Sequence, residues 1–410
     1  MIKSITLLGS SSGRNAGDAA LIAGIMDSVD RRLGRRVSYE IPTINPRYIR
    51  ECYDNETVPV GMMPWQMSVK MLGLPTWRSI MRTDLTLIFD AILFDRSLYN
   101  PLFNFLSSLY LMLPRAKRAG KKMAYMNVGA GPVTTPAGQR MLRELSELMD
   151  FIAVRDQSSY DILAGLGVKN PNMVTAADSA LTCPAHDKKV DELYKAAGID
   201  PSREILAVNV NRYLDTWAGT GRPSMGREAF VNVYREALNK VWREIRAPIV
   251  FISTQHHDVE ITKAVMDSLN PEIPRGHITN TTCDHYDIKG AAGRVGLLFG
   301  MRLHAIILTS SAGAPVCGLR YQPKVEHYLR TLGMEEQVLK FDDFNPDAMA
   351  AFILKNWRDR HALRERLKVV IPRQSALADA TSLFVEAIDQ GRPAADARPA
   401  FEAVRGSVSA

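Results

Sequence analysis

Short apolar runs alternate with stretches of helical periodicity along most of this chain. The runs that are long enough for a buried strand lie at residues 2–8, 37–41, 85–89, 122–128, 151–154, 173–177, 205–210, 249–253, 295–299 and 315–319. Between them, segments such as residues 19–33 and 227–246 carry apolar side chains at helical spacing. Continuous apolar runs indicate strands that are covered on both faces. The alternation therefore predicts an α/β fold built on doubly wound parallel sheets.

A chain of 410 residues exceeds the size of one ordinary core, so two domains are expected. We predict an N-terminal domain at residues 1–183, a C-terminal domain at residues 204–345, and a connection between them. Helical patterns continue through residues 346–390. The segment 391–410 is rich in Ala, Pro and Arg and is predicted to be disordered.

One strand-to-helix turn carries an arginine and a histidine close together. The apolar run 295–299 stops at Gly300, and a helical pattern begins at Leu303. Arg302 and His304 are therefore expected at the carboxyl edge of a parallel sheet. Arginine suits a carboxylate or a phosphate, and histidine can pass a proton near neutral pH. An isolated Arg-x-His sequence is more often a surface ion pair beside a packed histidine, so its context decides between the two interpretations.

Other polar residues follow the ends of strands in the same predicted sheet. Together with the first pair they are Asn209, Asn211, Arg212, His256, Asp258, Arg302, His304, Tyr321 and Lys324. Surface charge would be spread over both ends of the strands, whereas concentration at one edge is typical of a binding site. Several cations at this edge predict an anionic ligand that carries more than one charge.

The turn at residues 9–18 is rich in Gly and Ser and joins the first predicted strand to the first predicted helix. Backbone N–H groups at such a helix start can bind an anion. The turn is neither a Walker loop, because no Gly-Lys-Ser/Thr follows, nor a Gly-x-Gly-x-x-Gly fingerprint. Asp18 fits either a helix cap or a catalytic role, and both can hold together.

The segment 60–120 is rich in Met, Leu, Trp and Phe, with an apolar helix predicted at 99–113 and a basic flank after it. We interpret this helix either as a core element with a solvated end or as a surface that rests on an anionic membrane or grips a lipid-linked substrate. No apolar run approaches the roughly 18 residues that a membrane span needs, and the first residues do not fit a signal peptide. The expected location is the cytoplasm, with contact at the inner face of the membrane as an alternative.

Charge and cysteine content narrow the choice of ligand. The net charge of +7 favours anionic ligands. No basic block with interleaved aromatic residues is present, which argues against nucleic acid. The four cysteines are scattered without zinc spacing, so reduced thiols and no metal site are expected.

Taken together, these motifs resemble the polysaccharide pyruvyl transferase family. The family's most distinctive pattern is Arg-x-His in a strand-to-helix turn, followed by Pro and by Tyr-x-x-Lys; here it consists of Arg302, His304, Pro315, Tyr321 and Lys324. The N-terminal Gly-Asn-x-Gly-Asp turn of the family corresponds to residues 14–18, and its Arg-Asp-x-x-Ser-x-x-x-Leu block to residues 155–163. Its later aspartate corresponds to Asp178, and the resemblance covers residues 1–345.

The chain departs from the family pattern at one place. Many members carry a Gly-Gly pair after the strand that corresponds to residues 85–89, where this chain has Phe89-Asp90-Ala91, followed by Asp95. This loop belongs to the half of the chain in which an acceptor would lie. The resemblance therefore supports the donor side better than the usual acceptor.

The resemblance implies two Rossmann-like domains that face a cleft, similar to the GT-B glycosyltransferases. It also implies transfer of the pyruvyl group of phosphoenolpyruvate, the donor substrate, to paired hydroxyls of a sugar, which forms a ketal and releases phosphate. Asp18, entering from the facing domain, is implied as the base, and His304 as phosphate ligand or acid. The implied substrate-binding residues are Asn15, Gly17, Asn211, Arg212, His256, Arg302, Tyr321 and Lys324. No cofactor or metal is required, because cationic groups can stabilise the departing phosphate.

The sequence leaves three functions open. The first is a pyruvyl transferase that acts on a cytoplasmic precursor of a cell-surface polysaccharide, with a lipid-linked glycan as one form of the acceptor. The second is a GT-B-type glycosyltransferase, since the same cationic edge suits the diphosphate of a nucleotide sugar. The third is a non-catalytic subunit of a glycan assembly complex, which the joint presence of Asp18, Arg302 and His304 disfavours. Peripheral membrane contact through residues 60–120 and assembly into a homo-oligomer are also left open.

Overall fold

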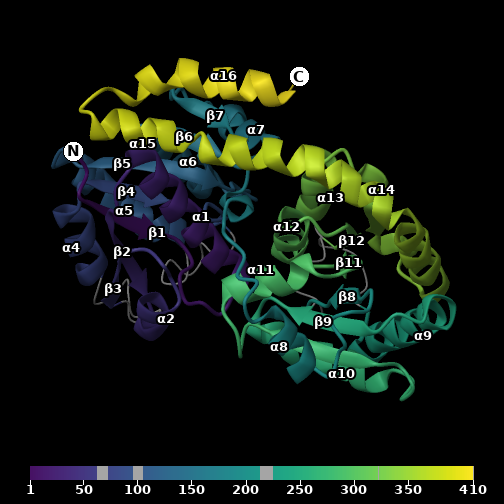
Figure 1. The fold of residues 1–410 in the computed structure, drawn as a ribbon. Helices are drawn as coiled ribbons and strands as arrows, with labels where there is room; N and C mark the ends of the chain where they lie inside the picture. Colours follow the sequence, from purple (N-terminus) through teal and green to yellow (C-terminus); the bar gives the residue numbers. More distant parts are fainter. Residues whose placement is uncertain (62–72, 96–104, 213–224, 322, 410) are drawn as a thin grey trace. The chain divides into compact units, whose positions relative to one another are not determined.

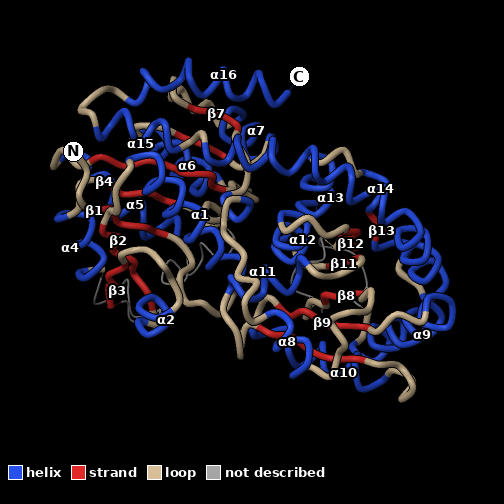
Figure 2. Tube along the Cα trace, viewed as in Figure 1, coloured by secondary structure: helices blue, strands red, loops and turns tan. Residues whose placement is uncertain are grey.

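The structure is a computed structural model that describes residues 1–61, 73–95, 105–212, 225–321 and 323–409 (Figure 1). The chain divides into two compact units, each built on its own sheet. The first unit comprises Met1–Gly13, Asp18–Cys183 and Arg373–Ala410, and the second comprises Arg14–Gly17 and Pro184–Pro372. Figure 2 shows the strands of both sheets in red with helices around them.

The described part of the first unit contains a sheet of seven parallel strands in the order β3-β2-β1-β4-β5-β6-β7. The strands are β1 Ser4–Leu8, β2 Ser38–Thr43, β3 Thr57–Gly61, β4 Leu85–Ile88, β5 Lys122–Val128, β6 Ile152–Val154 and β7 Met173–Thr175. This is a Rossmann-type order that reverses between β1 and β4. Every residue of β4 and β6 is buried, as the continuous apolar runs predict.

Among the helices of the first unit are α1 Ala16–Leu33, α2 Pro46–Glu51, α4 Leu74–Arg82, α5 Phe105–Arg118, α6 Pro136–Glu147 and α7 Gln157–Gly165. Three of these helices, α2, α6 and α7, begin at a side chain that caps them. Thr135 caps α6 by accepting from the backbone N–H of Gly138. The helix predicted at 99–113 overlaps α5, and its residues 99–104 lie outside the described residues.

The sheet of the second unit has six parallel strands in its described part, in the order β10-β9-β8-β11-β12-β13. They are β8 Leu206–Asn209, β9 Ile249–Ser253, β10 Arg275–Thr279, β11 Leu297–Gly300, β12 Val316–Arg320 and β13 Val338–Lys340. The order reverses between β8 and β11, whose last residues, Asn209 and Gly300, are register partners. Open α/β sheets bind ligands outside the carboxyl ends of the strands at such a reversal.

Helices of the second unit follow its strands in turn. They are α8 Val190–Ala196, α9 Arg227–Ile245, α10 Val259–Ser268, α11 His285–Gly293, α12 Leu303–Ser311, α13 Pro323–Thr331 and the first part of α14 Pro346–Asp379. Residues 184–203, predicted as a connection, belong to this unit. The reason is Tyr194 of α8, which is fully buried and donates its hydroxyl to the carbonyl of Ala291 at 2.6 Å.

The C-terminal tail is a helix. Residues 391–410 are predicted to be disordered, and this prediction is wrong, because α15 Ser382–Asp389 is followed by a short 3-10 turn and by α16 Arg398–Ser409. Phe401 of α16 is fully buried, and its ring centroid lies 5.7 Å from that of Phe384 of α15. The composition of the tail, rich in Ala, Pro and Arg, gives no sign of this small apolar face. In a helix, the few apolar side chains of the tail come together on one side, which can then be buried.

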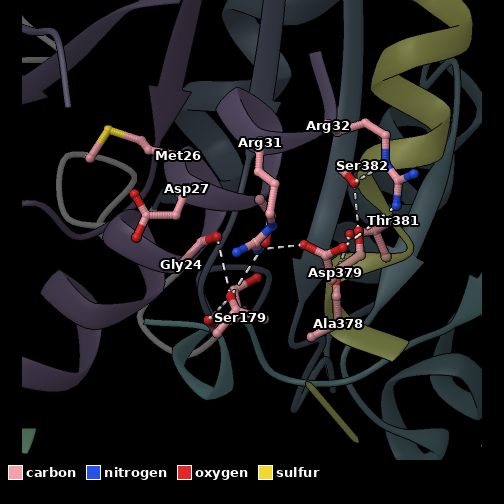
Figure 3. A network of polar contacts seen from close by, with 12 residues as sticks. Gly24, Met26, Asp27, Arg31, Arg32, Ser179, Ala378, Asp379, Thr381 and Ser382 are labelled. Atoms are coloured by element: carbon pink, nitrogen blue, oxygen red, sulfur yellow. Dashed lines mark hydrogen bonds and ion pairs between the residues drawn. The ribbon is translucent and has the colours of Figure 1, made fainter. Parts of the chain in front are cut away.

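The predicted helical segment 346–390 is shared between the two units. The single helix α14 begins in the second unit and ends in the first, with the boundary after Pro372. Near its end, Arg31 of α1 lies 2.8 Å from Asp379, measured from Nη2 to Oδ1 (Figure 3). The buried Nδ2 of Asn127 donates to the carbonyl of Ala378 at 3.1 Å. The exposed ion pair is worth at most about 1 kcal/mol, so burial carries most of this attachment.

The expected membrane contact has no direct structural description. Among the helices of the described residues, none combines the length and the apolar character needed to cross a bilayer. Within the segment 60–120, residues 62–72 and 96–104 lie outside the description. Contact with a membrane surface therefore stays a prediction.

We predict that Phe401→Ala destabilises the first unit by about 3–5 kcal/mol, because it leaves a cavity against Phe384. Urea unfolding monitored by tryptophan fluorescence measures the change. Arg405→Ala on the exposed part of the same helix is the control and should change stability by less than about 0.5 kcal/mol. Equal stability of both variants would show that the tail does not contribute to the core.

Candidate functional site

The side chain of Asn209 connects three strand ends at the reversal of the second sheet. Its Nδ2 donates to the carbonyl of Ile252 in β9 at 2.8 Å, and its Oδ1 accepts from the backbone N–H of Arg302 at 2.8 Å. Its carbonyl accepts from the N–H of Met301 at 3.2 Å. Because Asn209 is fully buried, these bonds satisfy its polar groups inside the protein. The turn that carries Arg302 is thereby fixed to β8.

Asp258 holds the side chain of Arg302 in a two-point ion pair. Nε of Arg302 lies 2.7 Å from Oδ2 of Asp258, and Nη2 lies 2.7 Å from Oδ1. Asp258 has no solvent-exposed surface, whereas the Arg302 side chain is 24% exposed. Oδ1 of Asp258 also accepts from the backbone N–H of Arg212 at 2.8 Å. The pair compensates most of the Arg302 charge, so this arginine offers directed N–H donors more than net positive charge.

Tyr321 and Asn211 complete the surroundings of Arg302. The Tyr321 hydroxyl is hydrogen-bonded to the side chains of Asn211 and Arg302. Burial raises the pKa of Tyr321 above its usual value, so its phenol stays protonated at neutral pH. Residues after β8, β9, β11 and β12 thus form one cluster, as the strand-end pattern predicts.

The loop Arg14–Gly17 belongs to the second unit, which corrects the predicted N-terminal boundary of 1–183. The carbonyl of Arg14 accepts from the N–H of His256 at 3.1 Å, and the N–H of Ala16 donates to Thr254 at 2.8 Å. Asn15 forms an antiparallel bridge with Gln255. These backbone bonds attach the loop to the residues that follow β9, and no local pattern in the sequence predicts such a distant pairing.

Gly17 lies directly against the ring of His304. A Cβ atom added to Gly17 would lie 2.3 Å from Cβ and Cγ of His304, a distance that no real side chain tolerates. The N–H of Gly17 donates to Oδ1 of Asn15 at 2.9 Å, which fixes the local turn. Asn15 and Gly17 are predicted as substrate-binding residues. In this structure they shape the loop on which the His304 ring rests.

The remaining predicted site residues follow a strand or lie near the start of a helix. Arg212 follows β8 and is exposed, and Lys324 is exposed in the first turn of α13. Nε2 of His256 lies 3.2 Å from the carbonyl oxygen of Asn280, after β10. Asp18 lies in the first turn of α1, in the first unit, immediately after Gly17 in the chain. Its predicted role as base stays a prediction.

The carboxyl edge of the first sheet carries an acidic network. Arg155 lies 3.4 Å from Asp178, between Nη1 and Oδ2, and 3.4 Å from Asp156, between Nε and Oδ2. Asp90 is also close enough to raise the Arg155 pKa. Asp90 occupies the departure from the family's Gly-Gly pair, and its φ of 69° lies in the left-handed region that favours glycine. The backbone conformation suited to glycine is therefore kept while a carboxylate is added.

Among the described residues, one group of side chains has metal-ligand spacing: His186, Asp284 and Asp287, whose ligand atoms lie within 4.8 Å of one another. Asp284 already caps α11 by accepting from the N–H of Asp287 at 2.9 Å. His186 stacks on the ring of Tyr286, with 4.4 Å between centroids. These contacts describe a helix start, and none of the three residues belongs to the predicted site.

The sequence pattern placed Asn209 and Asp258 at the correct edge without assigning them a role. Their signal was a polar residue at the end of an apolar run, for Asn209, or within five residues after one, for Asp258. The partner of each lies far away in the chain, since Asp258 and Arg302 are 44 residues apart. The order of the strands in the sheet determines which of these distant residues come into contact. The sequence therefore predicts that a residue lies at the carboxyl edge of the sheet, but not which residue it pairs with.

Solved structures with the same fold include proteins described in complex with UDP or with a UDP-sugar. UDP-GlcNAc 2-epimerase from Neisseria meningitidis bound to UDP-GlcNAc has a TM-score of 0.65 and 10% identity, covering 95% of this chain and 100% of that one. MnaA from S. aureus with UDP has a TM-score of 0.62 and 10% identity, covering 95% and 97%. Anabaena HepE with UDP has a TM-score of 0.54 and 11% identity, covering 99% and 100%. At these identities the likeness concerns the fold alone, which is GT-B-like with two parallel-sheet α/β domains.

Sequence comparisons identify a family, whereas the structural comparisons identify only a fold. No curated protein matches the chain significantly. The family model for polysaccharide pyruvyl transferase matches residues 15–323, which include the Arg14–Gly17 loop from Asn15 onward and the Arg302–His304 turn. A match over this share of the chain shows that the protein is a transferase of the polysaccharide pyruvyl transferase family.

Proposed function

We propose that this chain transfers the pyruvyl group of phosphoenolpyruvate to two hydroxyls of one sugar in a precursor of a cell-surface polysaccharide. The proposed products are a ketal-bearing glycan and phosphate, and the proposed acceptor is an exopolysaccharide precursor or a lipid-linked glycan made in the cytoplasm. Membership of the family supports the reaction class. The observation that carries the proposal is the Arg302–His304 turn at the reversal between β8 and β11, fixed by Asn209 and Asp258.

The donor's two anionic groups suit the residues of this edge. Phosphoenolpyruvate carries a carboxylate and a phosphate. The oriented guanidinium of Arg302 suits a planar carboxylate, whereas Arg212 and Lys324 are exposed cations that suit a phosphate. Their charges also stabilise phosphate as it departs, so the proposed chemistry uses no metal or cofactor.

The reaction requires an acid and a base. A proton adds to the vinyl carbon, one sugar hydroxyl bonds to the neighbouring carbon, and the second hydroxyl bonds there as the C–O bond to phosphate breaks. One hydroxyl proton is in effect moved to the new methyl group, and the other leaves with phosphate. We assign Asp18 as the base for the attacking hydroxyl and His304 as phosphate ligand or acid.

The alternative donor is a nucleotide sugar. Structures of similar fold are described in complex with UDP or with UDP-GlcNAc. Because that likeness is one of fold at about 10% identity, it does not favour this donor over phosphoenolpyruvate. UDP-sugars therefore serve as the comparison ligands in the test of donor binding.

We predict that phosphoenolpyruvate raises the thermal midpoint of the protein, whereas UDP-glucose and UDP-GlcNAc leave it unchanged. A ligand at about 100 times its Kd stabilises the folded state by about 2.7 kcal/mol. Arg302→Ala and His304→Ala should lose this stabilisation, and Arg330→Ala, an exposed arginine of α13, should keep it. Differential scanning fluorimetry gives the midpoints. Stabilisation by UDP-sugars alone would contradict the proposed donor.

We predict that Asp18→Asn keeps phosphoenolpyruvate binding and lowers turnover by about 10²–10⁴-fold, because the amide cannot accept the hydroxyl proton. Phosphate release in the presence of a lipid-linked glycan extract measures turnover, and mass spectrometry detects the added pyruvyl ketal. A variant that mainly loses stability would identify Asp18 as a structural residue of the first helical turn.

We predict that Gly17→Ala lowers turnover about 100-fold, because the added methyl group displaces the His304 ring. Gly165→Ala is the matched control, since nothing lies within 4 Å of a Cβ atom at that position. The same phosphate-release assay compares the two variants. Unchanged turnover in Gly17→Ala would mean that the His304 ring position does not limit the reaction.

A further inference from the structure

The carboxylate of Asp258 has no part in the proposed chemistry, yet it lies at the centre of the site. It is fully buried, and its two oxygens accept from Nε and Nη2 of Arg302 and from the backbone N–H of Arg212. These partners follow β11 and β8, whereas Asp258 follows β9. One carboxylate thus bonds to residues after both strands that flank the reversal of the sheet.

A two-point ion pair fixes more than the position of a charge. Because Nε and Nη2 are held together, the guanidinium plane cannot rotate about the last bonds of the side chain. The backbone of Arg302 is fixed separately by Asn209, and Tyr321, directly after β12, bonds to the Arg302 side chain. The guanidinium is therefore oriented before any ligand arrives, which removes the cost of ordering it during binding.

We propose that Asp258 is the positioning residue that orients Arg302 for the donor carboxylate, and that it acts through Arg302 without touching the donor. This inference rests on the proposed function. Asp258 also fixes the backbone where Arg212 begins the segment after β8, so the same carboxylate sets the starting point of a second cation. Because the negative charge of Asp258 offsets the charge of Arg302, Arg302 recognises the donor through the orientation of its N–H groups. Arg212 and Lys324 supply the net positive charge of the site.

A purely structural role for Asp258 predicts different behaviour. Breaking a buried ion pair leaves one charge uncompensated, whereas replacing both partners by neutral groups is often harmless to stability. A purely stabilising pair would therefore leave the affinity of the folded protein for phosphoenolpyruvate unchanged in Asp258→Asn. A positioning pair would weaken donor binding in Asp258→Asn, and this replacement would add no further loss of binding to Arg302→Met.

The experiment compares Asp258→Asn, Arg302→Met and the double variant with the wild-type protein. Calorimetry measures the Kd of phosphoenolpyruvate, and fluorimetry measures the thermal midpoint. We expect Asp258→Asn to weaken binding about 10- to 100-fold, the contribution of a hydrogen bond between charged groups that a misoriented guanidinium no longer makes. The double variant should regain most of the midpoint lost by Arg302→Met and bind no more tightly than Arg302→Met does.

Two further measurements keep the proposal testable. The ¹⁵N-labelled Nε–H signal of Arg302, assigned by its loss in Arg302→Met, should be a sharp resonance in the wild-type protein and should broaden or shift to the solvent-exposed position in Asp258→Asn. Asp258→Glu retains the charge and moves the carboxylate by one methylene, so it replaces Asp258→Asn where that variant does not fold. We expect it to weaken binding at least about ten-fold.

Each result bears on a different claim. Wild-type affinity in Asp258→Asn or Asp258→Glu, or effects of the two single variants that simply add, would overturn the positioning role and leave the proposed function intact. A wild-type protein that does not bind phosphoenolpyruvate would overturn the proposed function and the positioning role together.

Discussion

The ion pair between Asp258 and Arg302 is the constraint on which the carboxyl edge of the second sheet depends. A carboxylate without solvent contact is costly unless its partners compensate its charge. Arg302 and the N–H of Arg212 supply that compensation, and both lie outside the element that carries Asp258. The requirement to satisfy one buried group therefore brings residues after three strands into a single arrangement. The uncharged side chain of Asn209 acts in the same way, because its hydrogen bonds also join residues from different strands.

The two sheets share a strand order but differ in the charge at their carboxyl edges. In the second unit, the buried pair is compensated, and exposed Arg212 and Lys324 add positive charge. In the first unit, the buried Arg155 is surrounded by carboxylates, including Asp90 and Asp178. An anion is favoured at the former edge and disfavoured at the latter. This division matches an anionic donor and a hydroxyl-bearing acceptor, as proposed for the reaction.

Local patterns in the sequence predicted the elements well and their distant contacts poorly. Apolar runs located the described strands except β3, β10 and β13, and the polar residues after them marked the edge of the second sheet that holds Arg302 and His304. The cap of α7 shows the limit: Asp156 caps the helix by accepting from the N–H of Ser159, while the Ser159 hydroxyl accepts from the N–H of Ala130, 29 residues earlier in the chain. The Arg14–Gly17 loop and the C-terminal helix α16 are further cases, since both are held by residues far away in the chain. Such contacts depend on topology, which composition and periodicity do not contain.

The path of the chain between the two units has a consequence for how the protein folds during synthesis. The ring of Phe151 stacks on that of Phe384, with 5.0 Å between centroids, and Phe401 packs behind it. The core of the first unit is thus completed by residues that leave the ribosome after the whole second unit. Domains usually fold in order from the N-terminus as they emerge. We therefore expect the first half to keep apolar surface exposed until α15 and α16 have been made.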